Sequence, residues 1–186
     1  MGGVRHQRDT EQATLLVLNA SPIIYLCKAG ITGKLRGLKP SFRLVTSEQV
    51  YEEVYLEGIE KGVSEASALR ELFNEGIIEV ESPPRGGSKK VKELSKSAGI
   101  HAGEASVISQ ALALNATAII DDKRAREVAR VLGVRLSGTP GLIIELVRQR
   151  IISKDDAKRA LEKMVNEGWY CSAKLFSSII KTIDEQ

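Results

Sequence analysis

Side chains with oxygen ligands follow two short apolar runs of this chain. Asn19 comes directly after the run Thr14–Leu18, and Asp121 and Asp122 come directly after the run at 117–120. Both runs have the composition of strands that are buried on both faces of a parallel sheet. In such a sheet, ligands bind at the edge formed by the carboxyl ends of the strands. The three side chains are therefore candidates for one shared site.

Glutamates on the neighbouring helical segments extend this candidate site. Glu104 begins the segment that leads into the second run, and Glu52 and Glu53 lie on the segment after a predicted strand at 42–45. Amide and carboxylate oxygens without cysteine or histidine are typical ligands of hard cations such as Mg²⁺ or Mn²⁺. Without a cation, crowded carboxylates would repel one another and some would hold protons. Such a cluster with a divalent ion is the usual arrangement for phosphodiester hydrolysis.

Each of these residues also has a purely structural interpretation. Asp121 and Asp122 can form a turn and cap the next helix, and Glu104 is favourable in a first helical turn through the helix dipole. Glu53 can belong to a solvated helix face, and Asn19 can serve turn and cap chemistry. The hypothesis of a metal site therefore depends on the joint placement of these residues at one edge of the sheet.

Composition excludes several other kinds of site. The chain has 186 residues, of which 42% are hydrophobic and 27% charged, as in one globular domain or one domain with an appendage. The two cysteines and two histidines lack the close paired spacings that a four-ligand zinc site needs, and only His101 could serve a triad. We expect Cys27 and Cys171 to be small core residues. No glycine-rich phosphate-binding turn follows a strand, which excludes the common nucleotide cofactors.

The distribution of charge is more informative than its sum. The net charge of +3 does not by itself indicate nucleic-acid binding. Basic residues gather at 85–96 and at 123–135, with one acidic residue in each segment. Either segment can contact phosphates or form an ordinary solvated face. The candidates for nucleic-acid contact are Ser21, Lys89, Lys90, Lys123, Arg124 and Arg126.

Helical segments alternate with strand-like runs along the chain. This alternation predicts βαβ units, and so an α/β fold with a mainly parallel central sheet between helices. A further strand is predicted at 134–136, and residues 77–80 can form another strand or a ragged edge. The expected N-caps are Ser21, Ser47, Thr139 and Ser153, and Gly30 is expected to end the first helix. We expect Trp169 and Tyr170 to pack the last helix.

Five motifs, in order, resemble the PIN-domain superfamily. They are VLNASPII at 17–24, VYEEV at 50–54, GEA at 103–105, IIDDKRAR at 119–126 and SGTPG at 137–141. More narrowly, they resemble prokaryotic PIN-like proteins whose first strand ends in Asn-Ala-Ser-Pro. The resemblance implies a three-layer α/β/α domain and a ribonuclease centre that uses Mg²⁺ or Mn²⁺. It also implies that toxins of toxin–antitoxin pairs and homodimers are common among the relatives.

The resemblance carries the family's four acidic positions onto Asn19, Glu53, Glu104 and Asp122, with Asp121 as an accessory metal ligand. We expect the three carboxylates to hold the ion and Asn19 to orient the ion or its water. Asn19 departs from the family because its amide oxygen brings no negative charge, which should weaken divalent binding and catalysis.

These observations lead to a prediction for the whole chain. We expect a flexible N-terminal arm at 1–13, a PIN-like domain at 14–152 and a helical extension at 153–186 packed on the same domain. The chain has no apolar run long enough to span a membrane and no signal-peptide core, so we expect it in the cytoplasm. The predicted function is a metal-dependent endoribonuclease, with an antitoxin protein or a second copy as further partners. The alternative is a catalytically impaired scaffold that binds nucleic acid or protein.

Overall fold

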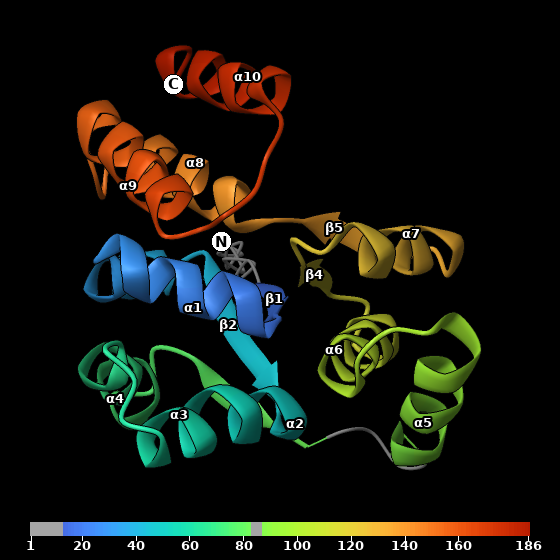
Figure 1. Cartoon of the computed structure of the whole chain (residues 1–186). Coiled ribbons are helices and arrows are strands. Elements are labelled where there is room, and N and C mark those ends of the chain that lie inside the picture. The colour runs from blue at the N-terminus through green and yellow to red at the C-terminus, as the bar shows by residue number, and fades with distance from the viewer. Residues whose placement is uncertain (1–12, 83–86) are drawn as a thin grey trace, which may run out of the picture.

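A five-stranded parallel sheet forms the centre of the protein (Figure 1). The computed structural model describes residues 13–82 and 87–186, so the predicted arm lies outside the described residues except for Ala13. The strands are β1 (Thr14–Leu18), β2 (Phe42–Ser47), β3 (Glu79–Glu81), β4 (Thr117–Ile119) and β5 (Arg135–Ser137). Their spatial order is β3-β2-β1-β4-β5, and every pairing is parallel. The predicted α/β fold with a parallel sheet is confirmed.

Helices connect the strands, and further helices make up the C-terminal part of the chain. They are α1 (Ala20–Ala29), the 3-10 helix η1 (Thr32–Leu38), α2 (Glu48–Tyr51), the π-helical turn η2 (Glu52–Leu56), α3 (Glu57–Glu60), α4 (Ala66–Asn74), α5 (Gly87–Ala98), α6 (Ala102–Ala113), α7 (Lys123–Val131), α8 (Thr139–Arg148), α9 (Lys154–Asn166) and α10 (Ala173–Asp184). None of the helices in the described ranges combines the length and the apolar character needed to cross a lipid bilayer.

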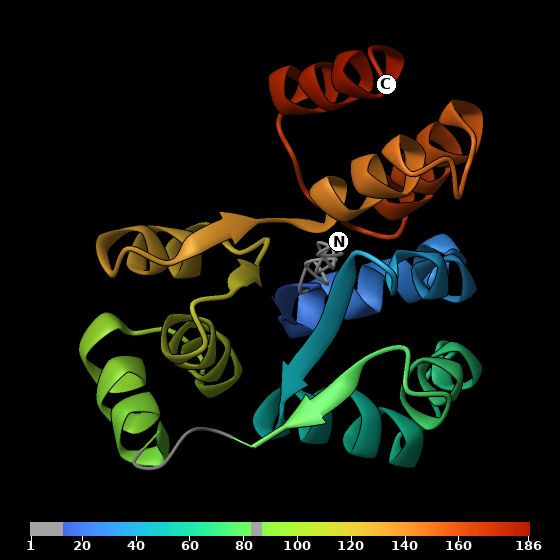
Figure 2. The same ribbon diagram turned by 180° about the vertical axis from the view of Figure 1, so that it is seen from behind.

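The helices cover both faces of the sheet. Because crossovers between parallel strands are right-handed, α1 and the helices before β3 lie on one face, and α6 and α7 lie on the other. In Figure 2, seen from behind, β2 passes in front of α1. Helix α9 packs against α1 and α8, and α10 packs against α8 and α9. The C-terminal helices therefore pack on the rest of the fold rather than standing apart from it.

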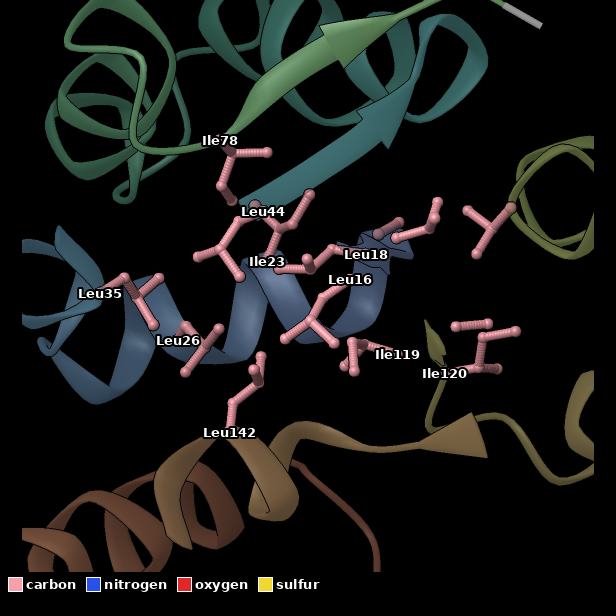
Figure 3. Packing of buried hydrophobic residues seen from close by; sticks show 14 of the residues in the cluster. Leu16, Leu18, Ile23, Leu26, Leu35, Leu44, Ile78, Ile119, Ile120 and Leu142 are labelled. Atoms are coloured by element: carbon pink, nitrogen blue, oxygen red, sulfur yellow. The ribbon is translucent and has the colours of Figure 1, made fainter. Parts of the chain in front are cut away.

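Part of the core lies between the sheet and α1. Leu16 and Leu18 of β1 are buried, and so is Ile23 of α1. Figure 3 shows Leu26 of α1 and Leu142 of α8 facing each other in the same cluster. Each fully buried side chain of this kind contributes roughly 1.5–3 kcal/mol through removal of apolar surface from water. This packing fixes the carboxyl ends of β1 and β4, where the candidate site residues follow.

Two predicted helix starts are confirmed and two are wrong. Ser47 and Ser153 are N-caps, as expected, and their hydroxyl oxygens accept hydrogen bonds from backbone amides of the first turn. Ser21 is not an N-cap, because α1 already begins at Ala20 and Asn19 is the capping residue. Thr139 is likewise inside α8, whose capping residue is Gly138. In both cases the proline stands within the first turn, where a backbone amide has no helical partner to lose.

Two further expectations differ from the structure. The third strand begins at Glu79, not at residue 77, because the amides of Ile77 and Ile78 both donate to the carbonyl of Leu72 and so terminate α4. Trp169 is buried, as expected, but Tyr170 is 91% exposed and packs no helix. Of these two neighbouring aromatic residues, Trp169 packs in the core and Tyr170 lies on the surface.

Candidate active site

Asn19 stands at the carboxyl end of the central strand. Its backbone amide donates to the carbonyl of Ile119 at 3.0 Å, which ties the end of β1 to the end of β4. The residue is only 4% exposed, and its side chain does not cap α1. The carboxamide instead lies beside Gly103, where its Oδ1 is 3.9 Å from the position that a Cβ atom would occupy. The first candidate residue is therefore buried and directed toward the start of α6.

Glu53 approaches the same glycine. Its Oε2 lies 3.0 Å from the position of a Cβ atom on Gly103, which is closer than ordinary van der Waals contact. Glu53 belongs to the π-helical turn η2, a kind of distortion that occurs frequently at functional sites. Because Gly103 has no side chain, the Glu53 carboxylate and the Asn19 amide can both reach the space above it.

Glu104 adds a second carboxylate at the start of α6. Its Oε2 accepts a hydrogen bond of 2.9 Å from the backbone amide of His101, so it caps the helix. Burial raises the pKa of the Glu104 carboxyl above its usual value, and the negative charges of Asp122 and Glu53 raise it further, against a lowering effect of the His101 hydrogen bond. The two other carboxylates thus lie close enough to repel the charge on Glu104.

Asp122 is the N-cap of α7. Its Oδ1 accepts a hydrogen bond of 2.8 Å from the amide of Ala125, and the side chain is otherwise exposed. The capping interpretation is therefore correct for both Asp122 and Glu104. It does not exclude ligation, because each of these hydrogen bonds involves one oxygen of the carboxylate and leaves the second oxygen for another partner.

Asp121 is held in a different network from Asp122. Its Oδ1 accepts from the amide of Thr139 at 2.8 Å, and its Oδ2 accepts from the Thr139 hydroxyl at 2.5 Å and from Nε1 of Trp169 at 3.3 Å. Gly138 lies beside it, and a Cβ there would stand 2.8 Å from Oδ1. These contacts connect the end of β4 to the start of α8 and to the segment before α10.

The side chains at this edge of the sheet supply the type of ligand atom that a hard divalent cation prefers. Asn19 supplies an amide oxygen, and Glu53, Glu104 and Asp122 supply carboxylate oxygens, which are the ligands that Mg²⁺ and Mn²⁺ prefer. Burial is the main cause of the raised pKa of Glu104, and a cation would relieve the smaller contribution that repulsion from Asp122 and Glu53 adds. In the part of the chain that the structure describes, no three His, Cys, Asp or Glu side chains are close enough to hold an ion as they stand.

Comparison with known families decides the family of this fold. A family model described as DUF3368, a PIN domain, matches residues 15–185. The chain belongs to this PIN-domain family. No curated protein and no solved structure matches it. A PIN domain has a nuclease-type fold and generally uses divalent metals, in agreement with the oxygen ligands at the sheet edge.

Three of the predicted nucleic-acid contacts of this PIN domain line one groove. Ser21, Lys123 and Arg126 border a hollow of about 550 Å³ that also reaches Asp122. Arg126 is half-buried, and its Nη1 donates to the carbonyls of Ile120 and Ser137, each at 2.7 Å. Burial lowers the pKa of this guanidinium, and the neighbouring positive charge of Arg130 lowers it further. Three predicted residues, one from α1 and two from α7, thus line the same hollow.

The other basic candidates lie elsewhere. Arg124 donates from Nε to the carbonyl of Ala98 at 3.0 Å, which attaches α7 to the end of α5. Lys89 is exposed on α5, with Glu93 3.9 Å from its Nζ. The side chain of Lys90 lies outside the described residues. The basic segment at 85–96 is therefore not part of the groove, as far as its described side chains show.

Some residues that shape the site of the PIN domain were not among the predicted site residues. Gly103 and Thr139 lie within the sequence motifs at 103–105 and 137–141. A motif alone does not indicate which of its residues contacts the candidate site residues. Arg130 stands four residues after Arg126, so helical spacing could have placed both on one face of α7. Trp169 could not have been found in this way, because it lies outside any periodic segment.

Cys27 is buried, as expected, and burial raises the pKa of its thiol to about 12.

Proposed function

We propose that this PIN domain is a metal-dependent endoribonuclease that hydrolyses phosphodiester bonds of RNA. The observation that carries the proposal is the approach of the Glu53 carboxylate and the Asn19 amide over Gly103. Glu104 and Asp122 support it, because their charges interact at the same edge. These residues come from four separate segments of the chain, and in the proposed centre they would act together at the carboxyl edge of the sheet.

Each of these residues has a role in the proposed centre. Glu53, Glu104 and Asp122 would hold Mg²⁺ or Mn²⁺ through the oxygens that the helix caps leave available. When bound, the ion would lower the pKa of a coordinated water and polarise a phosphoryl oxygen. Asn19 would orient the ion or its water through Oδ1 without adding charge. Lys123 follows Asp122 directly and can contact the phosphate of the strand being cleaved.

Asp121 takes a supporting role in this proposal. Both of its oxygens accept hydrogen bonds, from Thr139 and Trp169. A carboxylate engaged in this way orients the turn that presents Asp122. We therefore assign metal binding to Asp122 and positioning of the turn to Asp121.

A catalytically impaired scaffold is the second candidate. It is favoured by the neutral Asn19 at the first acidic position, since loss of one negative charge weakens binding of a divalent cation. Such a protein would keep the fold and bind RNA or a protein without cleaving RNA. An antitoxin partner, a toxic effect on the host and a homodimer stay predictions in both cases.

Cleavage and metal binding test the proposal together. We would incubate the full chain with end-labelled single-stranded and structured RNA in Mg²⁺ or Mn²⁺, and measure Mn²⁺ binding by electron paramagnetic resonance. Glu53→Gln and Asp122→Asn should each reduce cleavage by about 100-fold or more, as loss of a charge-stabilising group does. Glu52→Gln is the matched control, because Glu52 is an exposed neighbour on the same turn and should leave cleavage unchanged.

Asn19→Asp separates the two candidates. If the wild type cleaves RNA, this variant should bind Mn²⁺ more tightly because the site regains a negative charge. If only Asn19→Asp cleaves, the natural protein is the impaired scaffold. If neither binds Mn²⁺ nor cleaves any RNA, the catalytic assignment is wrong. Strong induction in a bacterial host, with Asp122→Asn as the control, tests toxicity: equal growth of both strains would contradict a toxin.

A further inference from the structure

We propose that the groove between α7 and the segment before α10 is the path of single-stranded RNA, with one base stacked on Tyr170 and phosphates held by Lys123 and Arg130. This inference rests on the proposed function, because it names how the strand reaches the candidate active site. Its test below is designed to fail separately from the catalytic proposal.

Two adjoining hollows form this groove. The first, of about 550 Å³, includes Asp122 and Lys123 in its lining, and the second, of about 390 Å³, is lined by residues from the start of α8 and from α10. Arg126, Arg130, Trp169, Tyr170 and Leu175 line both hollows. The groove is therefore continuous from the candidate metal ligand Asp122 to the exposed aromatic ring.

Positive charge dominates the wall formed by α7. Lys123, Arg126 and Arg130 all face the groove, and within the described residues none of them has a carboxylate oxygen within 4.0 Å. The acidic residues of the lining are Asp121, which is hydrogen-bonded to Thr139 and Trp169, and Asp122, at the candidate active site. Cations along a groove with no carboxylate in ion-pair contact are the pattern that attracts a phosphate backbone.

Tyr170 supplies an aromatic face on the opposite wall. The Tyr170 side chain is 91% exposed, so its ring gains no stabilisation from packing in the folded chain. Its neighbour Trp169 is 6% exposed and donates from Nε1 to Asp121, so the backbone that carries Tyr170 is attached to the sheet. Leu175, which is 49% exposed, lies in the same lining. An exposed aromatic ring in the same lining as a row of cations can stack a base while the cations hold its phosphates.

A single RNA strand fits these features better than a protein partner does. A strand has alternating phosphates and flat bases, and the groove offers cations on one wall and an aromatic ring on the other. The lining of the groove also includes Asp122, where the proposed reaction needs a phosphodiester. Stacking on a tyrosine does not select the base, because every base has an aromatic face. The groove should therefore give affinity and position with little sequence preference.

Binding without metal tests this inference. We would measure the Kd of the full chain for a fluorescein-labelled oligouridylate by fluorescence anisotropy in EDTA, so that no cleavage occurs. Tyr170→Ala should raise the Kd about 5- to 140-fold, the range expected for loss of one stacked base. Tyr170→Phe keeps the ring and should stay within about twofold of the wild type. Because Tyr170 is on the surface, neither change should impair folding.

The salt dependence distinguishes the roles of the residues. Arg130→Gln should reduce the slope of log Kd against log salt by about 0.7, the value for one phosphate contact on a single strand, whereas Tyr170→Ala should leave the slope unchanged. Arg70→Gln is the matched control, since Arg70 is an exposed arginine on α4 outside the groove, and it should change neither quantity.

The outcomes separate this inference from the catalytic proposal. Loss of affinity in Tyr170→Ala, together with no cleavage by any variant, would support the groove and reject the nuclease. Cleavage by the wild type with an unchanged Kd in Tyr170→Ala would overturn the groove and keep the nuclease. A glutamate-rich peptide of the same net charge that binds more tightly than the RNA would also overturn the inference, because the groove would then be a protein interface.

Discussion

The adjacent residues Asp121 and Asp122 should respond in opposite ways to the same substitution. In Asp121→Asn, the amide oxygen can still accept from the Thr139 amide, but an NH₂ group replaces the oxygen that accepts from Trp169 Nε1 at 3.3 Å. The Thr139 hydroxyl can rotate to become an acceptor, whereas the indole N–H cannot. The substitution therefore leaves a buried donor without a partner.

The size of the effect follows from these contacts. An unpaired buried donor costs about 1–3 kcal/mol, and the hydrogen bonds from Thr139 also lose the strength that a charged acceptor gives. We expect Asp121→Asn to lower the free energy of unfolding by about 2–4 kcal/mol, which for a chain of this length corresponds to a fall in Tm of roughly 4–16 °C. Asp122→Asn should change the free energy of unfolding by less than about 0.5 kcal/mol, because asparagine and aspartate are equally good N-caps.

Calorimetry and metal titration together check this pair. Differential scanning calorimetry gives the Tm of each variant without metal, and Mn²⁺ binding is measured at 20 °C, where we expect both variants to be folded. Asp121→Asn should keep Mn²⁺ binding and lose stability, whereas Asp122→Asn should lose Mn²⁺ binding and keep stability. If folded Asp121→Asn loses Mn²⁺ binding while its Tm is unchanged, Asp121 is a metal ligand and the reasoning is refuted.

Three other substitutions test the electrostatics and packing of the same edge. Burial and neighbouring charge raise the pKa of the Glu104 carboxyl in the folded protein. The ionised carboxylate therefore destabilises the folded state at a pH above that pKa. This destabilisation disappears as the pH falls toward 4.5, the pKa of the carboxyl in the unfolded chain. Glu104→Gln should therefore stabilise the metal-free protein by a few tenths of a kcal/mol at pH 8, and by less at pH 5, in calorimetry at both pH values. Gly103→Ala should improve helix propensity by roughly 0.5–1 kcal/mol but weaken Mn²⁺ binding, because its Cβ would stand 3.0 Å from Glu53 Oε2; undiminished binding in a titration would contradict this. Trp169→Phe should lower the Tm by about 2–4 °C through loss of its hydrogen bond to Asp121, with Mn²⁺ binding as the control that stays constant.

Local chemistry made much of the fold predictable. The strand Thr14–Leu18 was predicted with its correct bounds, because a short apolar run followed by turn residues has few other interpretations. Ser47, Ser153 and Gly30 were predicted correctly as helix ends, because a hydroxyl at an N-cap and a positive φ of 74° at Gly30 are local requirements. The two wrong N-caps show the limit: several polar residues near one helix start satisfy the same rule, and packing selects among them.

Tertiary contacts explain what the sequence could not show. Nothing in the adjacent pair Asp121 and Asp122 indicates which one bonds to residues 139 and 169. The π-helical turn at Glu53 was also hidden, because Val50 and Val54 stand four apart, as on an ordinary helix, and both are buried. Tyr170 was assigned to packing since it adjoins Trp169, but the segment has no periodicity that would separate a buried ring from an exposed one.

The position of β1 has a consequence for synthesis of the protein. β1 is made first and lies at the centre, where Leu18 pairs with Ile119 of β4, about a hundred residues later. A nascent chain on the ribosome therefore carries Asn19 and Glu53 long before Asp122 exists to join them. Closing so long a loop has an entropic cost that only the completed packing of β4 and α7 offsets. The proposed nuclease centre would therefore form only after most of the chain has been translated, and a truncated product of the same messenger would be inactive.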